Sequence, residues 1–216
     1  MVNHKKDKET LKELRELTKV KENWKERLDD VASKLNENYS TTIKAKALWL
    51  LGEMGLRYPK QVKTYVQKIA FYLDDEHPKI RERAVNALGR IGRGDRNLII
   101  PYLDEIMKMR KDNVDDVRLA FIWACENIAT NAPELFCGNM GLFYEMLEGT
   151  GERVRIEAPE IFRVIGKRKP EYVKPYLEKL QWFAENASHP VVRIHSAGAV
   201  RMTKKALEKM KNATND

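Results

Sequence analysis

The chain has 216 residues, with 40 Lys and Arg against 32 Asp and Glu, so its formal net charge is +8. Hydrophobic residues make up 43% of it, close to the average for a globular protein. No apolar run approaches the ~18 residues that a membrane span needs, and the charged N-terminus lacks the apolar stretch of a signal peptide. We therefore expect a cytoplasmic protein without a membrane partner. The excess charge favours an anionic partner, although solubility alone would explain it equally well.

The chain begins with two segments of helical spacing. Leu11, Leu14 and Leu17 predict a helix near 7–19, and the apolar residues from Trp24 to Leu35 predict another near 21–36. We interpret 7–36 as N-terminal capping helices that precede a repeated region over 41–208.

The repeated region has a period of 37 residues. An aliphatic residue followed by a basic one recurs at Ile43-Lys44, Ile80-Arg81, Val117-Arg118, Val154-Arg155 and, one residue late, Val192-Arg193. A period of this length is typical of stacked supersecondary units, each too small to bury its apolar face alone. We therefore expect residues 1–216 to form a single repeat domain.

Each period is expected to contain two helices. The first helices are predicted near 60–73, 97–110, 133–147 and 170–186, and the second near 41–55, 79–92, 115–130, 153–166 and 190–208. No stretch shows the period-two alternation and turn signals of a hairpin. The prediction is an all-α fold: a right-handed α-α superhelix, or solenoid, of about five helical hairpins.

The second helices resemble those of HEAT repeats, including the short HEAT-like repeats of phycobilin lyases. Residues 78–92 read PKIRERAVNALGRIG, which matches the Val-Arg opening, spaced Ala and Leu, and Ile-Gly ending of that family. HEAT repeats also carry an Asp six residues before the Arg, but Gly149 and Ala187 replace it in the last two units. The resemblance implies a hydrogen-bonded ladder between successive loops, broken at those two units, with the candidate residues Asp75, Arg81, Asp112, Arg118, Arg155 and Arg193. The alternative is that the recurring basic residues, here called the basic column, bind phosphate groups: Lys44, Arg81, Arg118, Arg155 and Arg193.

The resemblance also implies that the second helices line a concave face. The positions opposite the apolar stripe are then candidates for binding: Lys46, Trp49, Arg83, Asn86, Arg90, Trp123, Asn127, Glu157, Glu160 and His195. We call these ten residues the row. Trp and Arg are frequent in interaction hot spots and also hold nucleic acids by stacking and phosphate contact. Packing of both tryptophans between repeats is the alternative.

No catalytic constellation is evident in the sequence. Glu157 and Glu160 share a helix face, but most such pairs are merely solvated. Phosphate-binding glycine loops, zinc-protease motifs and nucleophile elbows are not found. Alkylpurine DNA glycosylases are also built on HEAT-like repeats with groove tryptophans, yet their Trp-Trp-Asp segment is missing, and no catalytic residue is carried over.

The sequence thus favours a non-enzymatic, monomeric scaffold that binds a protein or peptide on its concave face, without a cofactor or a metal. The alternative is a DNA- or RNA-binding HEAT-like protein, related to the alkylpurine DNA glycosylases. A lyase similar to the phycobilin attachment enzymes is a third and weaker hypothesis, since nothing in the sequence specifies a tetrapyrrole site.

Overall fold

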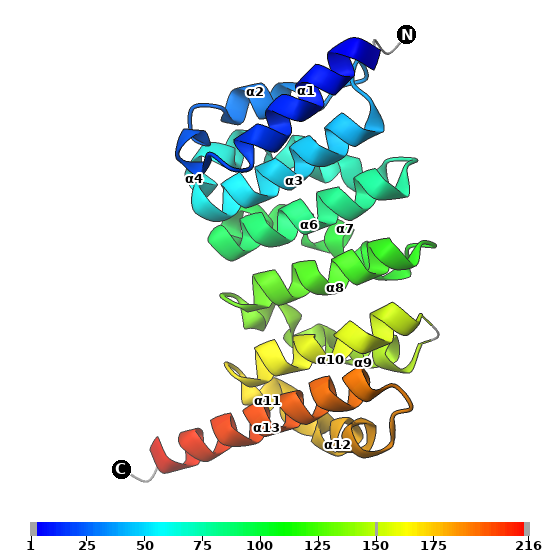
Figure 1. Ribbon diagram of the computed structural model, residues 1–216. Helices are drawn as coiled ribbons and strands as arrows, with labels where there is room; N and C mark the ends of the chain where they lie inside the picture. Colours follow the sequence, from blue (N-terminus) through cyan, green and yellow to red (C-terminus); the bar gives the residue numbers. More distant parts are fainter. Residues whose placement is uncertain (1–3, 150, 214–216) are drawn as a thin grey trace. The chain divides into compact units, whose positions relative to one another are not determined.

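The computed structural model describes residues 4–149 and 151–213 (Figure 1). Every regular element in this part of the chain is an α-helix or a 3-10 helix. None of the described helices is both long and apolar enough to cross a membrane. The chain divides into two compact units, Met1–Ala124 and Cys125–Asp216, called unit 1 and unit 2 below. The boundary between the two units lies within one helix.

Five long helices correspond to the predicted second helices. They are α3 (Thr41–Arg57), α6 (Pro78–Gly94), α8 (Asp115–Ala129), α10 (Glu152–Gly166) and α13 (Pro190–Ala213). Their first residues are separated by intervals of 37, 37, 37 and 38 positions. Pro78 and Pro190 each begin a helix, where the missing N–H of proline costs no hydrogen bond.

The predicted first helices are broken into shorter pieces. Unit 1 contains α4 (Pro59–Val62), η2 (Lys63–Tyr65), α5 (Val66–Phe71), η3 (Tyr72–Asp74), η4 (Arg96–Leu98), η5 (Ile100–Tyr102), α7 (Leu103–Lys108) and η6 (Met109–Lys111). Unit 2 contains η7 (Pro133–Asn139), α9 (Met140–Glu148), α11 (Pro170–Val173), η8 (Lys174–Tyr176) and α12 (Leu177–Asn186). Pro101 and Pro175 lie within two of the 3-10 turns and lack the amide that a continuous α-helix would use. Proline is not the only cause, because η2 contains none.

The N-terminal segment is less helical than predicted. It contains α1 (His4–Leu17), η1 (Lys21–Asn23) and α2 (Leu28–Ser33), so the helix expected near 21–36 forms only in part. Buried Trp24 accounts for the break: its indole N–H donates to the carbonyl of Leu17 at 2.8 Å and fixes the turn between α1 and α2. A side chain that folds back onto the preceding helix cannot be inferred from apolar spacing alone.

The core of unit 1 is formed by apolar stripes on its long helices. In α6, Ile80, Ala84 and Leu88 are fully buried. Glycines allow α3, α6 and α8 to approach closely (Figure 1). A Cβ atom on Gly52 would lie 2.7 Å from the Cα of Ala87, and one on Gly89 would lie 2.4 Å from the Cα of Ala124. The close packing sets the distances between side chains at matched positions of successive helices.

Unit 2 is built from α9 to α13, and its core follows the same stripe. Phe162 and Ile165 of α10 are fully buried, as is Ala199 of α13. A Cβ atom on Gly166 would lie within 2.0 Å of the Thr203 hydroxyl, so α10 and α13 also pack tightly. Both units therefore leave one face of each long helix available for other roles.

Candidate functional site

All ten row residues lie at positions intermediate between core and solvent. Each is partly exposed, and none is either fully buried or fully solvated: Lys46, Trp49, Arg83, Asn86, Arg90, Trp123, Asn127, Glu157, Glu160 and His195. Such exposure is expected for side chains that border the packed stripe of a helix. A ligand can therefore reach these residues without unfolding the core.

A pocket of about 390 Å³ lies at the start of the row in unit 1. It brings together three row residues, Lys46, Trp49 and Arg83. Its other lining residues are Leu11, Arg15, Thr41, Thr42, Ala45 and Lys79. The pocket thus joins side chains from α1, α3 and α6 around one tryptophan.

The pocket is strongly basic. The ammonium of Lys46 lies 4.0 Å from the centroid of the Trp49 ring, within the range of a cation–π contact. Burial, together with the positive charges of Arg83 and Arg15, lowers the pKa of Lys46. Among the described residues, no ion pair joins Lys46 or Arg15 to a carboxylate. Positive charge therefore accumulates here without full compensation.

One carboxylate offsets part of this charge. Glu82 accepts a hydrogen bond from Lys79 at 2.6 Å, and its second oxygen lies 3.7 Å from Nε of Arg83. Sequence reasoning missed three members of the cluster: Arg15, Lys79 and Glu82. Lys79 and Glu82 lie two residues before and one residue after Arg81, outside both the recurring basic positions and the apolar stripe of α6, so the repeat did not mark them. Arg15 lies outside the repeats, and no periodic signal marks it.

The other row residues of unit 1 lie outside this pocket. Arg90 forms an ion pair with Glu53, which links α6 to α3 one turn or more beyond Trp49. Asn86 and Trp123 do not line the pocket. Of the two tryptophans that the sequence placed in one row, only Trp49 therefore lines this pocket.

The row of unit 2 is acidic rather than basic. Glu160 accepts a hydrogen bond from Nε of Arg163 at 2.6 Å. Glu126, which sequence reasoning missed, is largely buried beside them. Burial, followed by the charges of Glu160 and Glu157, raises the pKa of Glu126 to about 8, although Arg163 opposes the shift. One oxygen of Glu126 is buried without a hydrogen-bond partner.

His195, the last row residue, is held by the backbone. Its Nδ1 lies 2.8 Å from the carbonyl oxygen of Ile156, so α13 is tied to α10 at this point. No group of three or more His, Cys, Asp or Glu in the described part of the chain is arranged to hold a metal ion.

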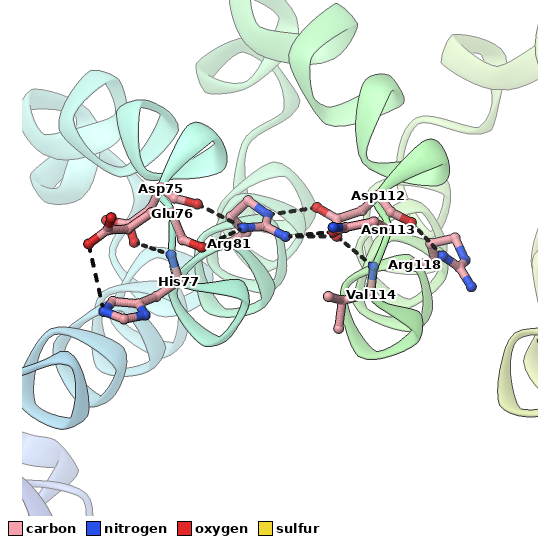
Figure 2. Close-up of polar contacts among 8 residues, drawn as sticks. All are labelled: Asp75, Glu76, His77, Arg81, Asp112, Asn113, Val114 and Arg118. Atoms are coloured by element: carbon pink, nitrogen blue, oxygen red, sulfur yellow. Dashed lines mark hydrogen bonds and ion pairs between the residues drawn. The ribbon is translucent and has the colours of Figure 1, made fainter.

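The loops of unit 1 carry the contacts that Figure 2 shows. Arg81 donates to both carboxylate oxygens of Asp112, at 2.7 and 2.9 Å, and to the carbonyls of Asp75 and Glu76, at 2.8 and 3.1 Å. Arg118 reaches the carbonyl of Asp112. One guanidinium thus links the loop that precedes α6 to the loop that precedes α8.

The carboxylates of these loops also cap their own turns. Asp75 accepts from the amide of His77 at 2.9 Å, and Asp112 accepts from the amide of Val114 at the same distance. Burial opposes the charged form of Asp112, but the hydrogen bonds from Arg81 and from the Val114 amide outweigh it and lower its pKa. The same hydrogen bond raises the pKa of Arg81.

Unit 2 keeps the loop geometry without the carboxylate. Arg193 donates to the carbonyls of Ala187 and Ser188, at 2.6 and 3.0 Å, as Arg81 does in its own loop. Ala187 stands where the repeat would place the Asp, and Nε of Arg155 is buried without a hydrogen-bond partner. The backbone angles of Ala187 (φ −59°, ψ 136°) are close to those of Asp112 (φ −57°, ψ 142°).

No known family model matches the chain, and no curated protein matches it. Solved structures do. An engineered protein from a structural genomics consortium matches with a TM-score of 0.64 at 17% identity, over 83% of this chain and 80% of the other. Computationally designed armadillo repeat proteins for modular peptide recognition match with a TM-score of 0.57 at 19% identity, over 84% and 87%. This chain has a helical-repeat fold of the armadillo-like kind.

A second engineered protein has the same helical-repeat fold. It matches with a TM-score of 0.62 at 17% identity, over 82% of this chain but only 47% of its own length. At these identities the likeness shows the fold alone. The specific HEAT family, the 37-residue period and the extent of a single domain remain predictions.

Proposed function

We propose that this protein is a non-enzymatic helical-repeat scaffold that binds a peptide segment of a partner along the row residues of unit 1, with the pocket around Trp49 as the principal anchor. The observation that carries the proposal is the pocket itself. It places a partly exposed tryptophan among four basic side chains, Arg15, Lys46, Lys79 and Arg83. Tryptophan and arginine dominate the binding energy of protein interfaces.

The armadillo-like fold supports the proposal in a general way. The designed armadillo proteins that it resembles were made for peptide recognition. In unit 1, glycines allow the long helices to pack closely, which holds the row side chains of this unit at fixed spacing, and a pre-organised surface binds an extended peptide at lower entropic cost. The row residues of unit 1 would then contact successive side chains of the peptide.

Nucleic acid is the competing partner, because a tryptophan among basic groups also suits a base and its phosphate. Two contacts favour a peptide. The face of Trp49 that meets Lys46 is already covered by the ammonium, which a stacking base would have to displace. Farther along the row, Arg90 is paired with Glu53 rather than turned to a ligand. A nucleic acid would need a continuous basic path.

A peptide-display selection against the immobilised protein tests the proposal. The selected peptides are then titrated by isothermal calorimetry with the wild type, Trp49→Ala and Trp182→Ala. Trp182 is the matched control, because it is 57% exposed but lies on α12, outside the row. We expect Trp49→Ala to weaken binding by about tenfold or more, as removal of a hot-spot tryptophan does, and Trp182→Ala to leave it unchanged.

Two results would overturn the proposal. One is a selection that yields no peptide dependent on Trp49. The other is a fluorescein-labelled dT20 strand that binds more tightly than any selected peptide and weakens steeply as salt rises, since that slope is the sign of phosphate contacts.

A further inference from the structure

The basic pocket of unit 1 also contains the beginning of a long helix. Thr41 and Thr42, the first two residues of α3, line it. The first amides of an α-helix have no partner within the helix. Ser40 stands at the N-cap with an extended backbone (φ −63°, ψ 158°), yet its side chain makes no capping hydrogen bond. The first turn of a 17-residue helix, whose N-terminus carries the positive end of the helix dipole, therefore lines the pocket, and its N-cap lacks the usual side-chain acceptor.

The cations around this helix start come from three elements. Arg15 belongs to α1, Lys46 to α3, and Lys79 and Arg83 to α6. Glu82 offsets Lys79 and, less closely, Arg83. Arg15 and Lys46 are left with each other and with Arg83 as charged neighbours, and this repulsion contributes to the lowered pKa of Lys46. About two positive charges in the pocket therefore have no carboxylate partner and could be neutralised by a bound anion.

We propose that the pocket binds the phosphoryl group of a phosphorylated serine or threonine in a partner peptide. The inference rests on the peptide-binding function proposed above and names the chemistry of its anchor. A phosphoryl group carries about −1.5 to −2 charges at neutral pH and offers three acceptor oxygens. It matches the two uncompensated cations, the helix amides and the hydroxyls of Thr41 and Thr42 better than one carboxylate does.

The remaining wall of the pocket fits the neighbouring residue of such a peptide. Leu11, Ala45 and the ring of Trp49 supply apolar surface beside the cations. An anion alone would leave this surface exposed, whereas a peptide would cover it with an adjacent side chain. The basic and the apolar lining residues of one cavity would thus serve the phosphorylated residue and its neighbour.

The surplus positive charge is confined to one pocket, and this also favours a phosphopeptide. Nucleic acids carry a phosphate at every nucleotide, so their binding surfaces offer a track of cations. In unit 1 the next basic residue of the row, Arg90, is already engaged by Glu53. One pocket with one surplus of charge indicates one anionic group on an otherwise ordinary segment.

Fluorescence anisotropy with a fluorescein-labelled heptapeptide pool tests this inference. The pool has a fixed central phosphoserine and random flanking residues, and a second pool carries serine in its place. We expect the phosphorylated pool to bind the wild type at least about tenfold more tightly, as the loss of charge-assisted hydrogen bonds implies. The double variant with Lys46→Gln and Arg83→Gln should lose the preference for the phosphorylated pool, because it removes two cations from the pocket.

The matched control variant removes two positive charges from the surface of unit 1, outside the pocket. Lys60→Gln with Lys63→Gln neutralises two exposed cations of unit 1 outside the pocket and should keep the preference. Amide resonances of Thr41 and Thr42 in ¹H–¹⁵N spectra should shift with the phosphorylated pool and not with the serine pool. These shifts report on the site even if the double variant folds poorly.

Three outcomes would overturn the inference: equal binding of the two pools, an equal loss in the pocket and control variants, or tighter binding of dT10 than of the phosphorylated pool. The inference and the proposed function can fail separately. If selected unphosphorylated peptides still bind through Trp49 while the two pools bind alike, the scaffold function is supported and phosphoryl binding in the pocket is refuted.

Discussion

The two units treat their charged residues in opposite ways. In unit 1 the loop charges are paired, Arg81 with both oxygens of Asp112, while Arg15 and Lys46 of the pocket have no carboxylate partner among the described residues. In unit 2 the loop contact is incomplete at Arg155, while the row carboxylate Glu160 is paired with Arg163. Unit 1 thus pairs its loop charges but leaves Arg15 and Lys46 of the pocket without a carboxylate, and this difference is why the candidate site lies there.

The largest effect is expected when the loop pair of unit 1 is broken. The side chains of Arg81 and Asp112 are only 14% and 6% exposed. Asp112→Ala leaves a buried guanidinium without its partner, which typically costs about 3–5 kcal/mol. Urea denaturation followed by circular dichroism measures the loss in the free energy of unfolding. Asp74→Ala removes an exposed carboxylate nearby and is the control; an equal effect of both variants would refute the role of the pair.

The same pair gives a pH dependence of known sign. The pKa of Asp112 is below its ordinary value of 3.8 in the folded protein. A carboxyl group with a lowered folded pKa stabilises the protein above its unfolded pKa, and this contribution is lost as the pH falls through the folded pKa. The difference between the wild type and Asp112→Ala should therefore be constant near neutral pH and shrink only in strongly acidic solution.

A second, opposite pH dependence is expected from unit 2. The folded pKa of Glu126 is about 8, well above its ordinary value of 4.5. Between those two values the unfolded chain is ionised while the folded protein retains the proton, so stability falls as the pH rises. Glu126→Gln mimics the protonated form. It should stabilise the protein by on the order of 1–3 kcal/mol at pH 8.5 and by little at pH 4.5.

Urea denaturation at several pH values between 4.5 and 8.5 measures this effect. Glu178→Gln, at an exposed position of α12, is the control and should show no such dependence. If wild type and Glu126→Gln lose stability in parallel as the pH rises, Glu126 is solvated and ionised, and the contrast between the two units weakens.

The sequence predicted the repeat better than it predicted the site. Helical periodicity and the recurring aliphatic–basic pair located all five long helices, because burial of a stripe dictates both patterns. The ten row residues were chosen from the same helical periodicity, and all are partly exposed. A single sequence cannot show which of these side chains lie close to one another. Arg15 reaches the pocket from a helix outside the repeat, and Arg90 is taken up by Glu53.

The other differences have local physical causes. The predicted first helices were too continuous, since Pro101 and Pro175 interrupt two of them. Glu126 was missed because it lies one residue from the predicted row position Asn127, and its raised pKa depends on burial and on charged side chains of α10. A periodic pattern fixes the face of a helix, whereas pKa shifts and pockets depend on neighbours that are distant in sequence.

Restoring the missing loop carboxylate should stabilise unit 2 modestly. Ala187 already has the backbone conformation of Asp112, and Nε of Arg155 lacks a partner. Ala187→Asp should therefore increase the free energy of unfolding by about 1 kcal/mol, the usual net value of a hydrogen bond. A double-mutant cycle with Arg155→Gln isolates the contact. A gain that survives in the double variant would show that the carboxylate acts without Arg155.

The smallest effect concerns backbone packing at Gly198 in α13, three residues after the row residue His195. A Cβ atom on Gly198 of α13 would meet only Cδ of Arg163, at 3.6 Å, which is ordinary contact. Gly198→Ala should therefore raise stability by about 0.5–1 kcal/mol, because alanine loses less entropy than glycine in a helix. Gly89→Ala in α6 should act in the opposite direction, since its Cβ would lie 2.4 Å from backbone of Ala124. Thermal denaturation of both variants measures the contrast. A destabilising Gly198→Ala would mean that α13 and α10 pack as tightly at Gly198 as α6 and α8 do at Gly89.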